Sequence, residues 1–308
     1  MQPVFIDTDT ASDDAVALIM ALCSSAVDVV GIGLVAGNVP VDVGLQTALF
    51  VRDLCGASCP AFAGASSPLI RELHTGQHVH GRDGMGDIGL ISGKREASKG
   101  HAVNALIDLA EEHAGALDLV TLGPLTNIAL ALRLEPLLAR MIRRCVVMGG
   151  ASDNYGNITP VSEFNFWCDP EAAEIVLASG MAIEIVGWDV SRQSAVFDSE
   201  EAARLGAIGT AKAHLAIDSQ AALTQFSLEK SGLAGFDLPD PIAMAVYLDP
   251  SLVTHSRSAP VHVALSEGPT RGQMIIDDRA KLSQRAEVAV IEAVSREGFV
   301  SMLQAALH

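Results

Sequence analysis

Aromatic side chains are scarce in this chain of 308 residues, in which Phe, Trp and Tyr together make up 4%. Hydrophobic residues nevertheless make up 49%, so the core must be built mainly from Ala, Val, Leu and Ile. Helices that pack on a buried parallel sheet use these residues. The composition therefore favours an α/β protein.

Cysteine is also sparse. An odd number, five, at irregular spacing argues against a disulfide framework, and no second pair follows Cys55 and Cys59 to complete a zinc site. The first ten residues contain no basic residue and no apolar stretch of signal length, and the apolar run at 15–23 is too short to span a bilayer. We therefore expect reduced thiols in a soluble, cytoplasmic protein.

Positive charge is in short supply as well. The chain has 20 Lys and Arg against 37 Asp and Glu, which gives a formal net charge of -17. Such a surface repels phosphate backbones and anionic membranes. Neither nucleic acid nor a membrane is an expected partner.

Short apolar runs and helical patterns alternate along the chain. The runs at 3–6, 27–35 and 60–62 indicate buried strands, with helices between them at 13–23 and 41–55. This βαβαβ order is typical of a parallel sheet with right-handed crossovers. Later strands are expected at 117–122, 145–148 and 183–186, later helices at 101–113, 125–133, 170–179, 200–205, 210–230 and 241–247, and short strands between 261 and 291 before a terminal helix.

A long segment at 64–100 interrupts the alternation. It is rich in Gly, Ser and His and has little periodicity, and so long a loop in a compact domain is usually functional or mobile. The chain contains no internal repeat and no obvious linker. We therefore predict a single α/β domain over residues 1–308, with a mainly parallel central sheet flanked by helices.

Four carboxylates lie within eight residues directly after the first expected strand: Asp7, Asp9, Asp13 and Asp14. Residues at i and i+2 of a strand face the same way, so Asp7 and Asp9 can converge, while the other two open the next helix. Like charges this close raise each other's pKa unless a cation lies among them, and the first basic residue is Arg52. Because only oxygen ligands are available, the ion would be calcium or magnesium. The carboxyl ends of the strands are where such sheets place their active sites.

Two other interpretations each account for part of the acidic run. A helix N-cap followed by first-turn acids accounts for Asp13 and Asp14 but not for Asp7 and Asp9. A metal-dependent phosphatase with an Asp nucleophile also places Asp-x-Asp after its first strand. That motif calls for Thr or Val two residues after the second Asp, where this chain has Ala11.

The run Asp-x-Asp-x-x-x-Asp-Asp resembles the N-terminal signature of the nucleoside hydrolases, the inosine-uridine preferring nucleoside N-ribohydrolases. Further motifs follow in the order of that family, from residue 3 to about residue 250. They are Gly37-Asn38, the His-Gly-Arg-Asp-Gly run at 80–84, the Leu-Gly-Pro-Leu-Thr-Asn run at 122–127, the Met-Gly-Gly run at 148–150, the Glu-Phe-Asn run at 163–165, the Asp-Pro-Glu-Ala-Ala run at 169–173 and Asp240-Pro241.

The resemblance implies a calcium-dependent hydrolase that cuts the N-glycosidic bond of ribonucleosides, and a homodimer or homotetramer. Asp9 matches the general base that deprotonates the attacking water. The matching calcium ligands are Asp9, Asp14, the backbone carbonyl of Leu122 and Asp240. The residues matching groups that contact the ribose are Asp13, Asn38, Met148, Asn157, Glu163 and Asn165.

The sequence departs from the family pattern at one position. Well-known members carry a His directly before the late Asp-Pro, where it protonates the leaving base, and this chain has Pro239. Proline cannot donate a proton. His80 is the first candidate for the missing acid and His78 the second. Alternatively the base is activated by stacking on an aromatic side chain, for which the candidates are Trp167, Trp188 and Phe226.

The sequence therefore predicts an N-ribohydrolase whose products are free ribose and a nucleobase. Positive charge develops on the sugar in such a reaction, and a pocket of carboxylates stabilises it. A metal-dependent phosphatase and a non-catalytic, calcium-dependent nucleoside-binding protein remain the alternatives. The second would follow if the change to Pro239 had abolished turnover.

Overall fold

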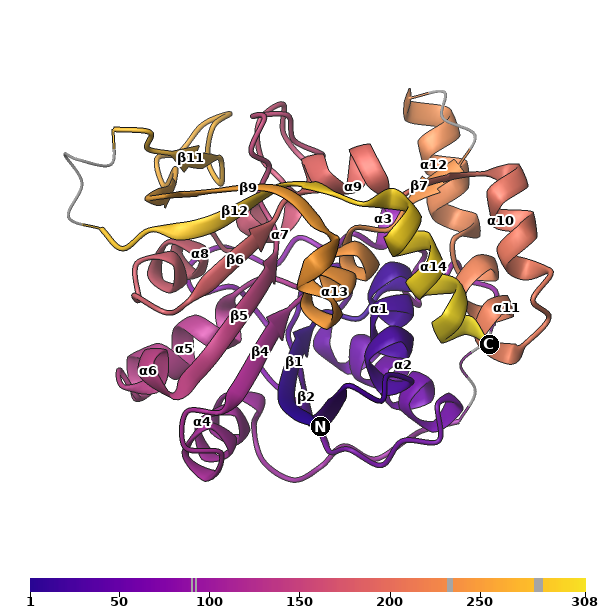
Figure 1. Cartoon of the computed structure of the whole chain (residues 1–308), viewed down its shortest axis with the longest axis horizontal. Coiled ribbons are helices and arrows are strands. Elements are labelled where there is room, and N and C mark those ends of the chain that lie inside the picture. The colour runs from indigo at the N-terminus through magenta and orange to yellow at the C-terminus, as the bar shows by residue number, and fades with distance from the viewer. Residues whose placement is uncertain (90, 92, 232–234, 280–284) are drawn as a thin grey trace.

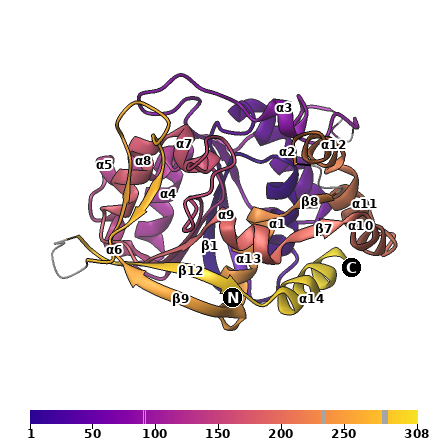
Figure 2. The same ribbon diagram turned by 90° about the horizontal axis from the view of Figure 1, so that it is seen from above.

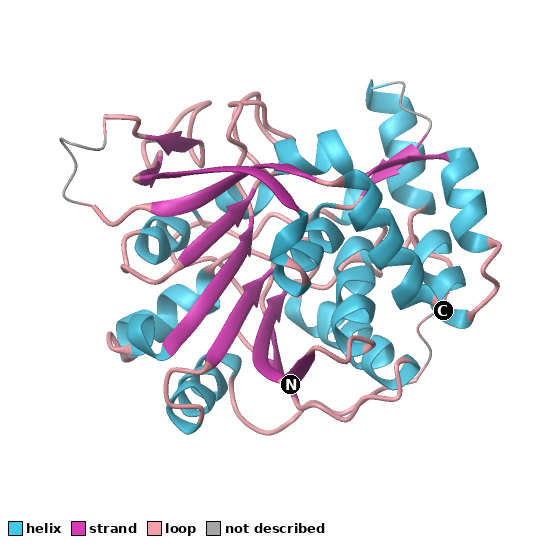
Figure 3. Cartoon of the chain, viewed as in Figure 1, coloured by secondary structure: helices cyan, strands magenta, loops and turns pink. Residues whose placement is uncertain are grey.

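The computed structural model describes residues 1–89, 91, 93–231, 235–279 and 285–308. Its centre is an eight-stranded sheet in the order β3-β2-β1-β4-β5-β6-β12-β9, which Figure 3 shows as one twisted layer. All neighbouring strands are parallel except β12 and β9, which are antiparallel. The strands are β1 (Gln2–Thr8), β2 (Val27–Leu34), β3 (Ala61–Ala63), β4 (Leu117–Thr121), β5 (Ile142–Met148), β6 (Ile183–Val186), β9 (Val253–Ala259) and β12 (Val288–Val294).

Helices cover both faces of this sheet (Figures 1 and 2). One layer contains α1 (Ser12–Leu22), α2 (Val41–Leu54), α13 (Pro239–Leu248) and α14 (Arg296–Leu307), and the other contains α4 (Ala102–Glu112), α5 (Thr126–Leu134), α6 (Leu138–Met141) and α8 (Pro170–Leu177). The alternation of side chains along each strand divides the core between the two layers. On β1, Val4 and Ile6 pack with α1, whereas Phe5 packs with α4 and α5.

The remaining elements lie outside the central sheet and these two helical layers. They are α3 (Gln77–His80), α7 (Phe164–Cys168), α9 (Trp188–Ser194), α10 (Ser199–Gly206), α11 (Ala211–Asp218), α12 (Ala221–Ser231), the 3₁₀ turn Pro250–Leu252 and two small antiparallel sheets, β7 (Val196–Asp198) with β8 (Gly235–Asp237) and β10 (Val261–Val263) with β11 (Met274–Ile276). Among the described residues, no helix is long and apolar enough to cross a lipid bilayer. All five cysteines are free thiols.

The predicted α/β class and mainly parallel sheet are confirmed, but several elements differ from the sequence interpretation. The single helix expected at 210–230 is two helices, because the chain turns at Ser219 and Gln220, which are both fully buried. The segment at 64–100 contains the short helix α3. The edge strand β9 was missed, since its largely exposed side chains do not form an apolar run.

From the edge strand β3 to β6, six strands follow the order 3-2-1-4-5-6, so the direction in which the strands are added reverses between β1 and β4. In open α/β sheets, a crevice forms at the carboxyl ends of the strands where this reversal occurs. The acidic run directly follows β1. The topology therefore places it at the expected position of an active site.

The terminal helix α14 provides a test of the packing. Phe299 is fully buried on α14 and lies 6.1 Å, ring centre to ring centre, from Phe197. We expect Phe299→Ala to lower the free energy of unfolding by about 3–5 kcal/mol, because it leaves a cavity. The control Ser301→Ala, at an exposed position of the same helix, should change it by less than about 0.5 kcal/mol in a urea titration. Equal effects of the two substitutions would contradict the packing of α14.

Candidate active site

The acidic cluster forms where two helices begin. Asp13 and Asp14 lie in the first turn of α1, and Asp240 lies in the first turn of α13, which packs against α1. One carboxylate oxygen from each of the three residues lies within 4.8 Å of the others, and all three residues are buried. The positive ends of the two helix dipoles offset part of the repulsion among the three carboxylates. Such a group could hold a metal ion.

Asp9 lies beside this triad. Its Oδ2 accepts a hydrogen bond from the backbone N–H of Asn38, whereas its Oδ1 has no hydrogen-bond partner among the described residues. A Cβ atom at Gly37 would lie 2.1 Å from Asp9 Oδ2, and one at Gly123 would lie 2.8 Å from Oδ1. Glycine at these two positions, after β2 and β4, therefore makes room for the Asp9 carboxylate.

Burial raises the pKa of every carboxyl in this cluster. The pKa of Asp13 rises to about 7 and that of Asp14 to about 6, and repulsion from Asp13 adds to the effect on Asp14. The pKa values of Asp9 and Asp240 are raised well above 3.8 by burial and then by repulsion from the neighbouring aspartates. Asp13 Oδ1, like Asp9 Oδ1, is buried and has no hydrogen bond within the described part of the chain. Unpaired buried oxygens among like charges fit a bound hard cation.

Asp14 is held more firmly than its neighbours. Its Oδ1 accepts from the Thr8 hydroxyl at 2.5 Å and its Oδ2 from the backbone N–H of Ala11 at 2.9 Å. Asp7, in contrast, accepts a hydrogen bond from Asn127 Nδ2 at 2.8 Å and does not line the pocket. The expectation that Asp7 and Asp9 converge because they are two residues apart on one strand does not apply, because β1 ends at Thr8, before Asp9.

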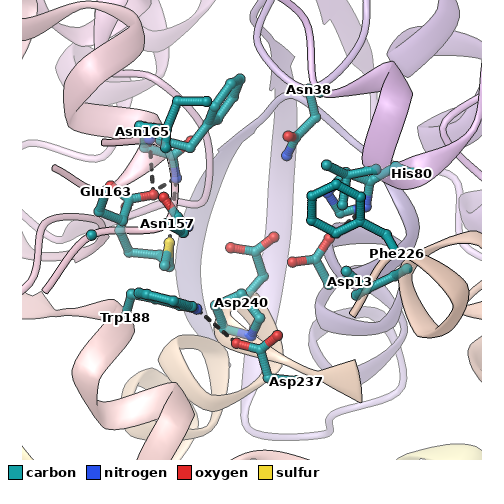
Figure 4. A pocket seen from close by; sticks show the side chains of 18 of the residues that line it. Asp13, Asn38, His80, Asn157, Glu163, Asn165, Trp188, Phe226, Asp237 and Asp240 are labelled. Carbon is teal, nitrogen blue, oxygen red and sulfur yellow. Dashed lines mark hydrogen bonds and ion pairs between the residues drawn. The ribbon is translucent and has the colours of Figure 1, made fainter. Parts of the chain in front are cut away.

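A pocket of about 370 Å³ opens in front of the triad. Figure 4 shows Glu163, Asn165, Asn157 and Trp188 along one wall and Asn38, His80 and Phe226 along the other, with Asp13 and Asp240 between them. The sequence-predicted residues that line the pocket are Asp13, Asn38, His80, Leu122, Met148, Asn157, Glu163, Asn165 and Asp240. Asp9 and Asp14 are fully buried and do not line it.

Asn165 and Glu163 are fixed by the chain around them. Asn165 Nδ2 donates to the carbonyl of Leu122 at 2.7 Å, so its Oδ1 is left as an acceptor. Glu163 caps α7 and accepts from the backbone N–H groups of Asn165, Phe166 and Gly150. Burial raises the pKa of Glu163 to about 7, against these hydrogen bonds. Both side chains are thus held in one orientation before any ligand arrives.

Aromatic side chains flank the open end of the pocket. Trp188 is stacked with Tyr155 at 6.0 Å between ring centres, and Phe226 meets His78 edge to face at 5.8 Å. All four line the pocket, whereas Trp167 does not. Of the three aromatic candidates, Trp188 and Phe226 are therefore placed at the site.

Asp237 was missed by the sequence analysis. It lines the pocket, and its Oδ2 accepts from Trp188 Nε1 at 2.8 Å and from the Ser191 hydroxyl at 3.1 Å. Burial raises its pKa despite these hydrogen bonds. It precedes the Asp240-Pro241 motif by three residues, but nothing in the sequence pairs it with a tryptophan 49 residues away.

The fold and this site define an α/β protein with a buried carboxylate centre and a polar pocket at the carboxyl ends of its parallel strands. The chain belongs to the inosine-uridine preferring nucleoside hydrolase family, whose model matches residues 4–301. It is 32% identical over 301 residues to the pyrimidine-specific ribonucleoside hydrolase RihB of Escherichia coli (strain SE11), covering 98% of this chain and 95% of that protein.

Solved structures agree with this assignment. The plant nucleoside hydrolase PpNRh1 superposes with a TM-score of 0.93 at 29% identity, over 99% of this chain and 98% of that one. The purine-preferring ribonucleoside hydrolase from Gardnerella vaginalis superposes with a TM-score of 0.91 at 30% identity, over the same shares of both chains. The predicted family is confirmed.

The raised pKa values predict how a cation changes stability with pH. Without a cation, Asp13 and Asp14 keep their protons in the folded chain at pH values where the unfolded chain has released them. Their contribution to stability is therefore complete below about pH 3.8 and is lost as the pH rises through about 6 to 7. A divalent cation binds the ionised cluster, so its stabilising effect should increase over the same range.

We expect calcium to raise the melting temperature more at about pH 8 than at about pH 5, relative to chelator. Asp240→Asn should remove most of this increment. The matched control Asp108→Asn, at an exposed position of α4, should keep it. Thermal unfolding followed by circular dichroism measures the effect, and an increment independent of pH would contradict the assignment of the cluster.

Proposed function

We propose that this chain hydrolyses the N-glycosidic bond of ribonucleosides to ribose and a free nucleobase, with calcium as its cofactor. The observation that carries the proposal is the buried aspartate cluster at the floor of a pocket whose walls present Asn, Glu and aromatic side chains. Carboxylates fit a sugar that becomes positively charged, and the polar walls fit its hydroxyl groups. The open end offers flat surfaces for a base.

The residues that would hold calcium are Asp9, Asp14, Asp240 and the carbonyl of Leu122. The structure groups Asp13, rather than Asp9, with Asp14 and Asp240, so in this proposal Asp13 would face both the ion and the ribose. The Leu122 carbonyl already accepts one hydrogen bond from Asn165 and keeps a second lone pair. When bound, calcium would neutralise the negative charge of the cluster, and it would orient the ribose diol and the water.

Asp9 is the proposed general base. The Asn38 N–H and the glycines around it fix the carboxylate, and its second oxygen remains available to take the proton of the attacking water. Burial raises its pKa, which strengthens it as a base near neutral pH. The water then attacks C1′ as the bond to the nucleobase breaks.

The ribose is held by the preorganised polar residues of the pocket walls. Asp13, Asn38, Asn157, Glu163 and Asn165 are the proposed partners of its hydroxyl groups, and Met148 lines its pocket. Since Asn165 is already oriented by the Leu122 carbonyl, little reorganisation is needed on binding. A sugar that lacks a hydroxyl would leave one of these buried groups unpaired.

The proton for the leaving base comes from His80 in this proposal. Pro239 lines the pocket but carries no proton, and His80 lies across from Trp188 beside Phe226 (Figure 4). Burial lowers the pKa of His80 to about 4, so the imidazole is neutral at rest. It must first take up a proton from solvent, which it then passes to the leaving base, and the protonated form is strongly acidic. One relative is pyrimidine-specific and another purine-preferring, so the substrates to be tested include both kinds of base. A homo-oligomeric state and a cytoplasmic location stay predictions.

The proposal is tested by assaying ribose release from a panel of purine and pyrimidine ribonucleosides, with calcium and with chelator. We expect release from at least one ribonucleoside, loss of activity with chelator, and weaker activity on the matching 2′-deoxynucleoside. Parallel phosphate release from a generic phosphate ester would favour a phosphatase instead. Nucleoside binding in calorimetry without ribose release would indicate a binding protein.

The role of Asp9 is tested by Asp9→Asn, which keeps the shape of the side chain but removes the base. We expect kcat to fall by about 10²- to 10⁴-fold, the usual contribution of a general base, with an unchanged circular dichroism spectrum. The control Asp42→Asn, at an exposed position of α2, should retain full activity. A near-normal rate for Asp9→Asn would remove Asp9 from this role.

A further inference from the structure

A chain of hydrogen bonds connects three segments behind the wall of the pocket. His80 Nδ1 lies 3.1 Å from the Ser12 hydroxyl, and that hydroxyl lies 3.0 Å from Gln220 Oε1. Ser12 and Gln220 are fully buried, and His80 is 9% exposed. The three residues come from the start of α1, the end of α3 and the turn between α11 and α12. We call this chain the His80 relay.

The orientation of the Gln220 amide follows from its neighbours. Gln220 Nε2 lies 3.1 Å from the carbonyl oxygen of Ser12 and 3.3 Å from that of Ala216. Carbonyl oxygens only accept hydrogen bonds, so the NH₂ group must face them. Gln220 Oε1 is therefore the atom that faces the Ser12 hydroxyl, and it can only accept.

The direction of the whole relay is then fixed. Ser12 has one hydroxyl proton, which it donates to Gln220 Oε1, so toward His80 its oxygen can only accept. Nδ1 must therefore carry a proton. If Ser12 instead donated its proton to His80 Nδ1, lone pairs of Ser12 Oγ and Gln220 Oε1 would face each other at 3.0 Å. Such an unpaired contact between two buried acceptors is costly.

We infer that Ser12 and Gln220 are positioning residues that keep a proton on His80 Nδ1 and hold Nε2 toward the pocket. Nε2 has no hydrogen-bond partner among the described residues, and His80 lines the pocket. Any proton that His80 exchanges with a ligand must then pass through Nε2, on the side where the nucleobase lies. This inference rests on the proposed function only for the identity of that ligand.

The relay differs from one that uses a carboxylate. Asp13 Oδ1 is 3.9 Å from His80 Nδ1, beyond hydrogen-bond distance. Ser12 and Gln220 are neutral, so they set the tautomer and the ring orientation without adding a charge at Nδ1. The role resembles that of the orienting residue in a catalytic triad, which fixes which nitrogen of a histidine carries the proton.

The tautomer is directly measurable in the full-length, calcium-loaded protein. We expect two-bond ¹H–¹⁵N correlation spectra of ¹⁵N-histidine-labelled protein at neutral pH to show His80 with a protonated Nδ1 and an unprotonated Nε2. His80→Gln identifies its signals. Histidine in water favours the opposite tautomer, so a protonated Nε2 with a bare Nδ1 would overturn the inference. No turnover is needed for this measurement.

Two substitutions break the relay at different links. Ser12→Ala and Gln220→Met should both shift His80 toward the Nε2-protonated tautomer and lower kcat by about 10- to 100-fold, as is typical of residues that orient a functional histidine, with a smaller change in KM. The control Thr224→Ala removes a hydroxyl whose one hydrogen-bond partner among the described residues is the backbone carbonyl of Gln220, and it should leave the tautomer unchanged.

The outcomes separate the relay from the proposed function. The expected tautomer without ribose release from any nucleoside would contradict the function and leave the relay intact. Ribose release with the opposite tautomer, or with the same tautomer in Ser12→Ala as in the native chain, would contradict the relay. If either substitution prevents folding, the spectrum of the native chain still decides which nitrogen carries the proton.

Discussion

The structure depends on the burial of several like-charged carboxylates at one point. Asp13, Asp14 and Asp240 approach within 4.8 Å of one another where α1 and α13 begin. Their burial there carries a free-energy cost, which raises the pKa of each. Helix dipoles, the Thr8 hydroxyl and backbone N–H groups offset only part of that cost. A bound cation offsets the rest, so the same cluster that destabilises the empty site provides its affinity for metal.

This constraint explains why much of the site could be predicted from the sequence. The acids at 9, 13 and 14 are close together in the chain, directly after a buried strand, and elementary electrostatics already requires a partner for them. Asp240 lies far along the chain, and only the resemblance to a family brought it into the site. The sheet was predictable for a similar reason, because its inner strands are continuous apolar runs. The exposed strand β9 carries no such signal.

The parts that could not be predicted arise from contacts between distant segments. Asp237 reaches the pocket because Trp188 and Ser191 on α9 hold it, and no local pattern in the sequence indicates that pairing. Gln220 appears in the sequence as one polar residue within a helical stretch. In the structure it interrupts that stretch, because its side chain is buried against Ser12. Such residues owe their position to hydrogen-bond satisfaction in the interior, a property of the folded chain.

Pro239 connects the residues that the sequence predicts with those that only the folded chain brings to the pocket. It occupies the first turn of α13, where its fixed backbone angle favours the start of a helix and its missing N–H removes no helical hydrogen bond. The position thus contributes to placing Asp240 but offers no proton to the pocket. The polar groups at the open end must then come from other elements, and the structure supplies His80 from α3 and Asp237 from β8. Because the relay reaches His80 through Ser12, which directly precedes Asp13, the orientation of the histidine and the geometry of the carboxylate cluster are set by the same turn of α1.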